Sequence, residues 1–266
     1  MRLDDYVVQQ GQGLPLVFIH GSFASDATWK KIIAEQATKH HCIAIKLPGH
    51  GGAPEPNDMQ APTLATELDL VVDLIEQTTN QAVHLIGHSF GGVVALAVAL
   101  SGRVKIRQLT LFEPVAAWVL AVAQDHQHYQ QVQDCFALYQ QDLAHPNVDA
   151  CQRVIDFWGQ AGDFKALPES IQEQMRGLTA HNFRHWQLSK NISTTAQDLQ
   201  RCTIPTHVIY GTCSSPVTRA VCEHLATLMP YCQVFTIQGA SHFLVTTHPS
   251  QCLAMINRPW SVNNTF

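Results

Sequence analysis

The sequence predicts an α/β fold, in which a mostly parallel, doubly wound sheet is interrupted by an inserted helical segment. Two observations lead to this prediction. Short apolar runs typical of buried strands alternate with helical patterns from residue 14 to residue 112, which indicates parallel strands joined by right-handed crossovers. The alternation stops after Pro114 and resumes at Thr206, so the residues between them are interpreted as an insertion.

Seven runs are expected to be strands, and the first of them is a short strand at the edge of the sheet. The run Leu14–Ile19 shows no alternation of polar and apolar residues, as is typical of strands that are covered on both faces. A turn signal rich in glycine follows the third run, at residues 48–52. The expected strands are residues 3–10, 14–19, 42–47, 82–86, 106–112, 206–210 and 233–237.

Helical patterns fill the connections between these strands. A helix is expected to begin near Ser25 or Asp26, because apolar side chains follow at helical spacing. Residues 63–79 carry an apolar stripe along one face, as does an amphipathic helix that packs on a sheet. The remaining helices of the core are expected at residues 90–101, at residues 216–229 and from Pro249 onward.

Residues 115–200 contain no convincing strand and many aromatic side chains. We therefore divide the chain into an α/β core, residues 1–114 and 201–266, and a helical cap, residues 115–200. Ligands of α/β sheets bind at the carboxyl ends of the strands, so a helical insertion can form a lid over that edge. Its tryptophans are candidates for lining a substrate pocket, with packing inside the cap as the alternative: Trp118, Trp158 and Trp186.

Composition argues against several classes of function. The chain has 266 residues, of which 46% are hydrophobic. Because its net charge is −5, we expect no basic face that would bind nucleic acid or a lipid surface. No apolar run approaches the ~20 residues of a membrane span, and we expect no signal peptide. Eight scattered cysteines without C-x-x-C spacing indicate free thiols and a cytoplasmic setting. Histidine pairs lack further ligands at suitable spacing, so we expect no metal; the oligomeric state is left open.

The stretch Gly87–Gly92 (GHSFGG) follows an apolar strand-like run and precedes a small apolar helical run. A strand, a sharp turn and a helix, with serine at the apex of the turn, is the arrangement of a nucleophile elbow. The apex residue has a strained backbone, and side chains on the flanking glycines would collide with the strand or the helix. The turn would push the Ser89 hydroxyl out of the sheet, at the positive end of the helix. The alternative is a helix N-cap that follows a glycine turn.

Four segments together resemble the α/β-hydrolase superfamily, and more narrowly its small cap-bearing esterase and C–C hydrolase branch. They are His20-Gly21, Pro48–Gly51 (PGHG), Gly87–Gly92 and Gly239–His242 (GASH), in this order along the chain. The resemblance implies that Ser89 is the nucleophile and that His242, in the loop after the last strand, is its base. A serine hydroxyl needs such a base because it is a weak nucleophile by itself.

The resemblance also implies an oxyanion hole made of two backbone N–H groups. One belongs to Phe90, the residue after the nucleophile. The other comes from the loop after His20-Gly21, where we expect Ser22 to be the donor and Phe23 is the alternative. Phe23 is also a candidate for touching substrate.

The triad acid is missing from its usual place, because the turn after the strand 206–210 contains no carboxylate. Glu113 ends the strand that follows the nucleophile helix. Neighbouring parallel strands end about 4.8 Å apart, so this glutamate can reach His242 from another side. We therefore expect Glu113 to be the triad acid. The alternative is that Glu113 is solvated and that Ser214 or Ser215 orients the histidine.

A serine nucleophile argues against the dehalogenase and epoxide-hydrolase branches of this superfamily, which attack with aspartate. We expect hydrolysis of a small, largely apolar carboxylic ester through a Ser-His-Glu triad and an acyl-enzyme intermediate, without a cofactor. The partner is then a small-molecule ester. The alternatives are a C–C bond hydrolase or thioesterase of the same fold, and a ligand-binding member that has lost turnover.

Overall fold

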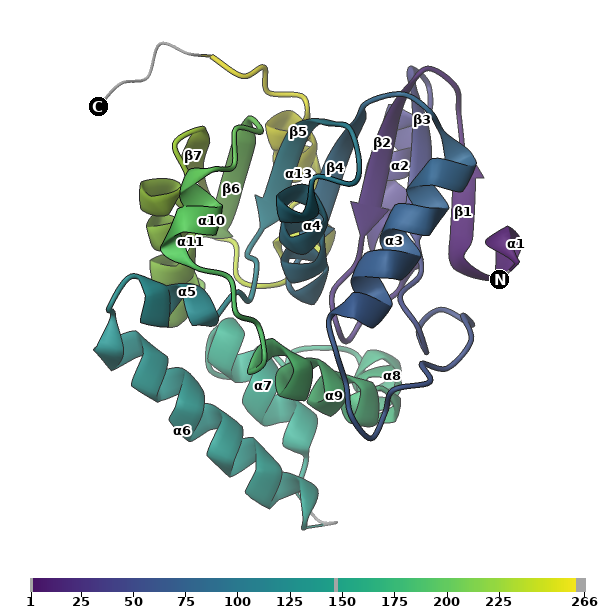
Figure 1. Ribbon diagram of the computed structural model, residues 1–266. Helices are drawn as coiled ribbons and strands as arrows, with labels where there is room; N and C mark the ends of the chain where they lie inside the picture. Colours follow the sequence, from purple (N-terminus) through teal and green to yellow (C-terminus); the bar gives the residue numbers. More distant parts are fainter. Residues whose placement is uncertain (1, 146–147, 262–266) are drawn as a thin grey trace.

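The computed structural model describes residues 2–145 and 148–261, and its centre is a sheet of seven strands (Figure 1). The strands are β1 Val7–Gln10, β2 Leu14–Ile19, β3 His40–Ile45, β4 Val83–His88, β5 Ile106–Phe112, β6 Thr206–Gly211 and β7 Cys232–Ile237. They lie in the order β1-β3-β2-β4-β5-β6-β7, and among them the edge strand β1 alone runs antiparallel to its neighbour. The prediction of a mostly parallel α/β sheet is confirmed.

The prediction of a strand over residues 3–10 is wrong in its first half. Leu3–Tyr6 form one turn of helix, α1, and Val7–Gln10 pair with β3. Asp4 and Asp5 lie in the first turn of α1, where the helix dipole favours negative charge. A window of eight residues is too short for the helical and strand periods to be told apart.

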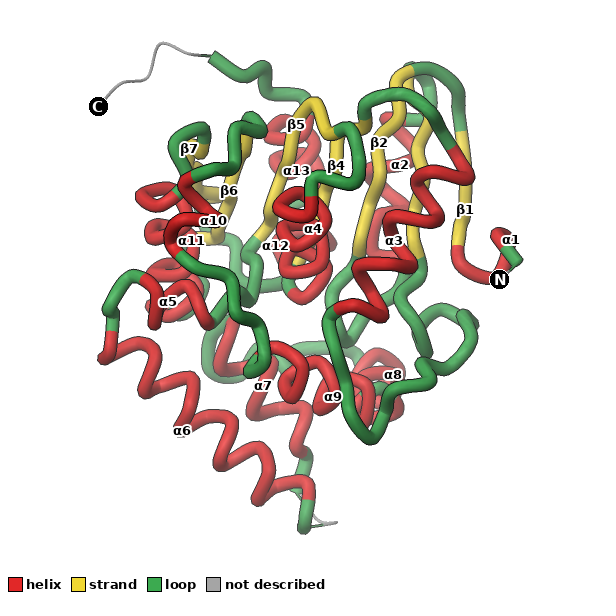
Figure 2. Tube along the Cα trace, in the orientation of Figure 1, coloured by secondary structure: helices red, strands yellow, loops and turns green. Residues whose placement is uncertain are grey.

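Helices cover both faces of the sheet (Figure 2). Successive side chains of a strand point into two different apolar cores. In β2, Val17 and Ile19 belong to one core, and Leu16 and Phe18 belong to the other. The first core includes α3 Ala65–Thr78, α4 Phe90–Ser101 and α11 Pro216–Leu228. The second includes η1 Asp26–Trp29, α2 Lys30–Gln36, α12 Leu244–Thr247 and α13 Pro249–Ile256.

Between β5 and β6 the chain is helical, and its described residues 115–145 and 148–200 contain no strand. The helices are α5 Trp118–Val122, α6 His126–Leu143, α7 Ala150–Trp158, α8 Glu169–Gly177, α9 Thr179–Ser189 and α10 Ala196–Gln200. Figure 1 shows that α6 to α9 lie together beyond the carboxyl ends of the strands. By contrast, α10 packs beside α11 on one face of the core.

A buried ion pair holds α9 against the core. Arg184 of α9 is 1% exposed, and its guanidinium lies 2.5 Å from the carboxylate of Glu67 in α3, which is fully buried. The same guanidinium lies 2.6 Å from Asp58, in the loop before α3. Charges are costly to take out of water, and loss of one partner would leave the other buried and unpaired. This ion pair joins the insertion to the core, and it requires Arg184 of α9 as well as Glu67 of α3.

The close approach of α4 to β2 predicts the effect of one substitution. A Cβ atom on Gly91 would lie 2.3 Å from the carbonyl oxygen of His20 and 2.4 Å from that of Ile19. Because both neighbours are backbone atoms, Gly91→Ala is expected to lower the free energy of unfolding by about 3 kcal/mol or more. The control is Gly177→Ala in α8, where no atom lies within 4 Å of the added Cβ and the expected change is below ~1 kcal/mol. Urea denaturation measures both, and equal changes in the two variants would contradict this account.

Candidate active site

Ser89 occupies the turn between β4 and α4 and has a strained backbone, with φ 56° and ψ −123°. Such a conformation costs on the order of 1–3 kcal/mol outside glycine and persists where the surrounding structure holds it. The neighbouring glycines are required here, because a Cβ atom on Gly87 would lie 2.4 Å from the carbonyl oxygen of Gly91. The turn presents the Ser89 hydroxyl at the carboxyl edge of the sheet.

Side chains that follow three different strands meet at this point. His242, in the loop after β7, places its Nε2 3.0 Å from Ser89 Oγ. Its Nδ1 lies 2.7 Å from Oε2 of Glu113, which directly follows β5. This geometry fits a ring that donates its Nδ1–H to the carboxylate and accepts the serine proton at Nε2. The structure therefore brings these three sequence-predicted residues into one hydrogen-bonded line, and all three are buried.

The carboxylate of Glu113 accepts two further hydrogen bonds, one from the last residue of β6 and one from the loop that follows it. The backbone N–H of Gly211 and the hydroxyl of Ser214 donate to Oε1 over 2.6 and 2.5 Å. The turn after β6, which contains no carboxylate of its own, thus contacts the carboxylate of Glu113 at the end of the neighbouring strand β5. Ser214 is bonded to Glu113 and not to His242, and Ser215 caps α11.

The loop after β2 lies against Ser89. A Cβ atom on Gly21 would lie 3.0 Å from Cβ of Ser89, so glycine allows this loop to approach the serine. Ser22 and Phe90 line the same cavity as Ser89. Among the described residues, no backbone carbonyl accepts the N–H of Ser22 or that of Phe90. Both groups are available to an oxygen bound in the cavity.

Two buried histidines hold this loop in place. His20 donates its Nδ1–H to the carbonyl of Gly21 over 2.7 Å, and its Nε2 accepts the N–H of Leu47 over 3.1 Å. His50 places its Nε2 2.7 Å from the carbonyl oxygen of Ser22. Burial, together with the nearby His50, lowers the pKa of His20 to about 3, so its ring is neutral and can accept a hydrogen bond at pH 7.

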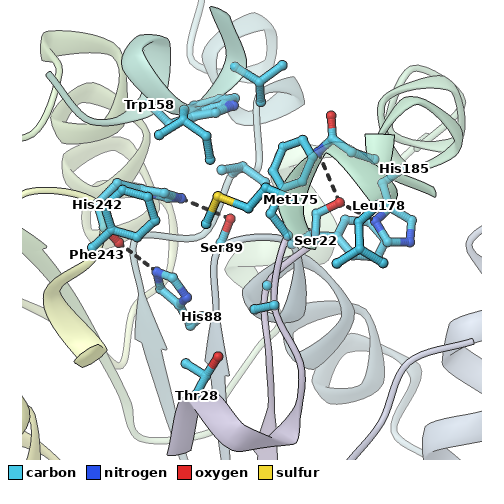
Figure 3. A pocket seen from close by; sticks show the side chains of 18 of the residues that line it. Ser22, Thr28, His88, Ser89, Trp158, Met175, Leu178, His185, His242 and Phe243 are labelled. Atoms are coloured by element: carbon cyan, nitrogen blue, oxygen red, sulfur yellow. Dashed lines mark hydrogen bonds between the residues drawn. The ribbon is translucent and has the colours of Figure 1, made fainter. Parts of the chain in front are cut away.

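A cavity of about 720 Å³ lies over Ser89 and His242 (Figure 3). Three of the four aromatic residues expected to contact substrate line it: Phe23, Trp158 and Trp186. The fourth, Trp118, does not line it, because α5 packs against α11 and turns this side chain into the apolar core. Most of the remaining wall is apolar and includes Val154, Ile155, Ile171, Met175, Leu178 and Phe243.

The sequence pattern of the alpha/beta hydrolase family matches residues 16–255, which include the sheet from β2 to β7 and the whole insertion. The chain belongs to the alpha/beta hydrolase family. The resemblance found in the sequence and the expectation of a hydrolase enzyme are confirmed.

Relatives of this α/β-hydrolase include proteins named as esterases. It is 24% identical over 271 residues to the pimeloyl-[acyl-carrier protein] methyl ester esterase of Aeromonas salmonicida (strain A449), covering 92% of this chain and 95% of that protein. It is 33% identical over 105 residues to the probable lysophospholipase BODYGUARD 1 of Arabidopsis thaliana, a match that covers 37% of this chain and 22% of that protein. The solved esterase EaEST from Exiguobacterium antarcticum shares the fold, with a TM-score of 0.73, 18% identity, and coverage of 94% of this chain and 93% of that one.

Two residues of α9 that the sequence analysis did not single out contact the loop after β2 in this α/β-hydrolase. His185 places its Nδ1 2.6 Å from the hydroxyl oxygen of Ser22, and Asn182 donates its side-chain N–H to the same oxygen over 2.9 Å. Both residues are buried and line the cavity. Their spacing of three residues in a helical pattern places them on one face of a helix, which is the signal that could have found them.

Other expectations concern metals, membranes and disulfides. In the part of the chain that the structure describes, no group of three or more His, Cys, Asp or Glu side chains is arranged to hold a metal ion. Over residues 2–145 and 148–261, no helix is long and apolar enough to cross a membrane. All eight cysteines lie in these segments and are free. The cytoplasmic location of this α/β-hydrolase stays a prediction.

The buried histidines predict a pH-dependent stability. Burial, and to a smaller degree the neighbouring His242, lowers the pKa of His88 to about 3, against 6.5 for an exposed ring. Between these values the unfolded chain binds a proton that the folded protein does not. The free energy of unfolding is therefore expected to fall as the pH drops from about 6.5 toward 3, by about 1.4 kcal/mol per pH unit for each such ring. His20 and His84 are shifted in the same way.

Urea denaturation at several pH values between 7 and 4 measures this slope. His88 Nε2 lies 2.9 Å from the carbonyl oxygen of His242, and His88→Gln keeps a donor for that oxygen but does not titrate. This variant is expected to reduce the slope by about 1.4 kcal/mol per pH unit. A slope identical to that of the parent protein would show that His88 is not held neutral in the fold.

Proposed function

We propose that this α/β-hydrolase is a serine hydrolase that cleaves small, largely apolar carboxylic esters. The observation that carries the proposal is the hydrogen-bonded line from Ser89 through His242 to Glu113, at the base of an apolar cavity. In this proposal Ser89 is the nucleophile and His242 is the general base and acid. Glu113 orients the imidazole and stabilises its charged form. A relative that matches over nearly the whole chain is named as an esterase, which supports an ester as the substrate.

The reaction begins with a substrate whose ester carbon lies over Ser89. Nε2 of His242 takes the hydroxyl proton as Ser89 Oγ bonds to this carbon, and the carbonyl oxygen becomes an oxyanion. The N–H groups of Ser22 and Phe90 donate to this oxyanion. The intermediate then collapses, the bond between the carbon and the alcohol oxygen breaks, and His242 gives its proton to the leaving oxygen.

Water releases the acyl group from the acyl-enzyme. His242 takes a proton from a water molecule as the water oxygen attacks the acyl carbon, and the ring returns this proton to Ser89 when the acid leaves. In both halves of the cycle the carboxylate of Glu113 faces Nδ1 and balances the positive charge of the ring. The hydrogen bonds from Gly211 and Ser214 keep the carboxylate in that position.

The cavity supports an apolar substrate of modest size. Its volume of about 720 Å³ lies within the usual range of small-ligand pockets, roughly 300–1,000 Å³. Trp158, Met175 and Phe243 lie around Ser89 in Figure 3, so a hydrocarbon group of the ester would be buried against carbon surface. We further propose that residues 115–200 act as a cap, because half of the residues that line the cavity over Ser89 lie in this segment, most of these in α7, α8 and α9.

Ser89→Ala removes the proposed nucleophile. The rate of p-nitrophenyl butyrate hydrolysis is expected to fall by roughly 10⁴-fold or more, because the members of a catalytic triad act as a unit. A fluorophosphonate should label the parent protein once, at Ser89 by mass spectrometry, and leave the variant unlabelled. Ser101→Ala, at the other end of α4, is the control and should keep the parent rate. If the parent protein hydrolyses p-nitrophenyl butyrate no faster than Ser89→Ala and is not labelled by the fluorophosphonate, the protein is a ligand-binding member of the family without turnover.

Glu113→Gln keeps the shape of the side chain but removes its charge. The imidazolium then lacks its counter-ion, and kcat is expected to fall by about 10³-fold. Steady-state kinetics with the same ester measures this loss. The matched control is Glu223→Gln, since Glu223 is the first carboxylate after β6 and contacts Tyr210 and Arg219; its kcat should stay near that of the parent. A Glu113→Gln variant within threefold of the parent kcat would reject Glu113 as the acid.

A further inference from the structure

His185 of α9 contacts both residues whose N–H groups are proposed to bind the oxyanion. Its Nδ1 lies 2.6 Å from the hydroxyl oxygen of Ser22. Its ring stacks on that of Phe90, with the centroids 3.7 Å apart and the planes 11° from parallel. Figure 3 shows His185 beside Ser22, across the cavity from His242. One imidazole from the insertion thus bridges the loop after β2 and the start of α4.

The hydrogen bonds around Ser22 have one consistent direction. Burial, followed by the neighbouring His50 and Arg184, lowers the pKa of His185 well below its usual value, so the ring is neutral and carries a single N–H. Its Nε2 lies 4.0 Å from the carboxylate of Glu67, which favours the proton on that nitrogen. Nδ1 then accepts the proton of the Ser22 hydroxyl. Asn182 donates its Nδ2–H to the same oxygen over 2.9 Å.

Ser22 is therefore held on two sides. His185 and Asn182 engage its hydroxyl, and Nε2 of His50 lies 2.7 Å from its carbonyl oxygen. The N–H of Ser22 belongs to the peptide unit of the Gly21 carbonyl, which accepts from Nδ1 of His20 over 2.7 Å. With the side chain of Ser22 and the carbonyls on both sides of it engaged, this N–H has little freedom to rotate away from the cavity. This rigidity is the property that an oxyanion donor needs, since donors fixed before the reaction require no reorganisation during it.

We infer that His185 is a positioning residue, which holds Ser22 and Phe90 so that their N–H groups converge on the oxyanion. The inference rests on the proposed serine hydrolase function and adds that the insertion helps to position the groups that bind the oxyanion. The helix that carries His185 is itself fixed, because the adjacent residue Arg184 pairs with Glu67 in α3. The position of α9 therefore fixes the His185 ring, and the ring in turn fixes Ser22 in the loop after β2.

Two variants remove the contact from opposite sides. His185→Phe keeps an aromatic ring against Phe90 but cannot accept from Ser22, and Ser22→Ala keeps the backbone N–H but removes the hydroxyl. For each, kcat for p-nitrophenyl butyrate is expected to fall by about tenfold to a hundredfold, with KM within about twofold, because the contact acts on the transition state. Phenylboronic acid forms a tetrahedral adduct with a catalytic serine, and its affinity should fall by the same factor.

A double variant and a control separate positioning from simple packing. Ser22→Ala/His185→Phe should be no slower than the slower single variant, because both changes remove the same contact. Gln187→Ala, on the same helix, should keep the parent kcat. Losses that multiply in the double variant, or a kcat within twofold of the parent for either single variant, would overturn the inference. If His185→Phe does not fold, Ser22→Ala decides the question by its own kcat and its affinity for phenylboronic acid.

The two proposals fail in different ways. If Ser89→Ala keeps the parent rate, the serine hydrolase assignment fails and the role of His185 fails with it. If Ser89→Ala is inactive while Ser22→Ala keeps the parent kcat and the parent affinity for phenylboronic acid, the hydrolase assignment stands and the role of His185 alone is rejected.

Discussion

The buried carboxylate of Glu113 joins the parts of the site that come from different strands. Glu113 directly follows β5 and has a positive φ of 45°. Its carboxylate accepts hydrogen bonds from Gly211 at the end of β6, from Ser214 in the next loop, and from His242 after β7. A buried carboxylate is costly without such donors, and the donors would be left unpaired without the carboxylate. The loops therefore stabilise one another through this anion. The position of the imidazole against Ser89, on the adjacent strand β4, depends on it.

Much of this arrangement could be predicted from the sequence, because each strand and helix carries its own period and a parallel sheet brings the strand ends together. Glu113 was predictable because the turn after β6 offers no carboxylate. The contacts of α9 with Ser22 could not be predicted, because they join residues that are 160 and 163 positions apart in the sequence. A local sequence pattern does not indicate which distant loop a face of a helix will contact. For the same reason nothing in the pattern separated Trp118, which is packed in the core, from Trp158 and Trp186, which line the cavity.

Polar contacts orient α9 on the core, whereas its aromatic side chains Phe183 and Trp186 pack against other helices of the insertion. Apolar surfaces tolerate small shifts, whereas a buried ion pair or hydrogen bond is satisfied in a narrow range of positions. Arg184 and His185 are adjacent in the chain and reach different parts of the core, the first to α3 and the second to the loop after β2. Two anchors with different directions define both the place and the rotation of the helix.

The residues proposed to carry out the reaction lie outside residues 115–200, whereas half of the residues that line the cavity lie within them. A substitution within the insertion can therefore change part of the cavity wall and leave the residues proposed for the chemistry, on the core side of the boundary, as they are. The pair Ser22 and His185 crosses this boundary. A chimaera that exchanges the insertion between relatives would have to carry both partners, or else redesign the loop after β2 to suit the new helix.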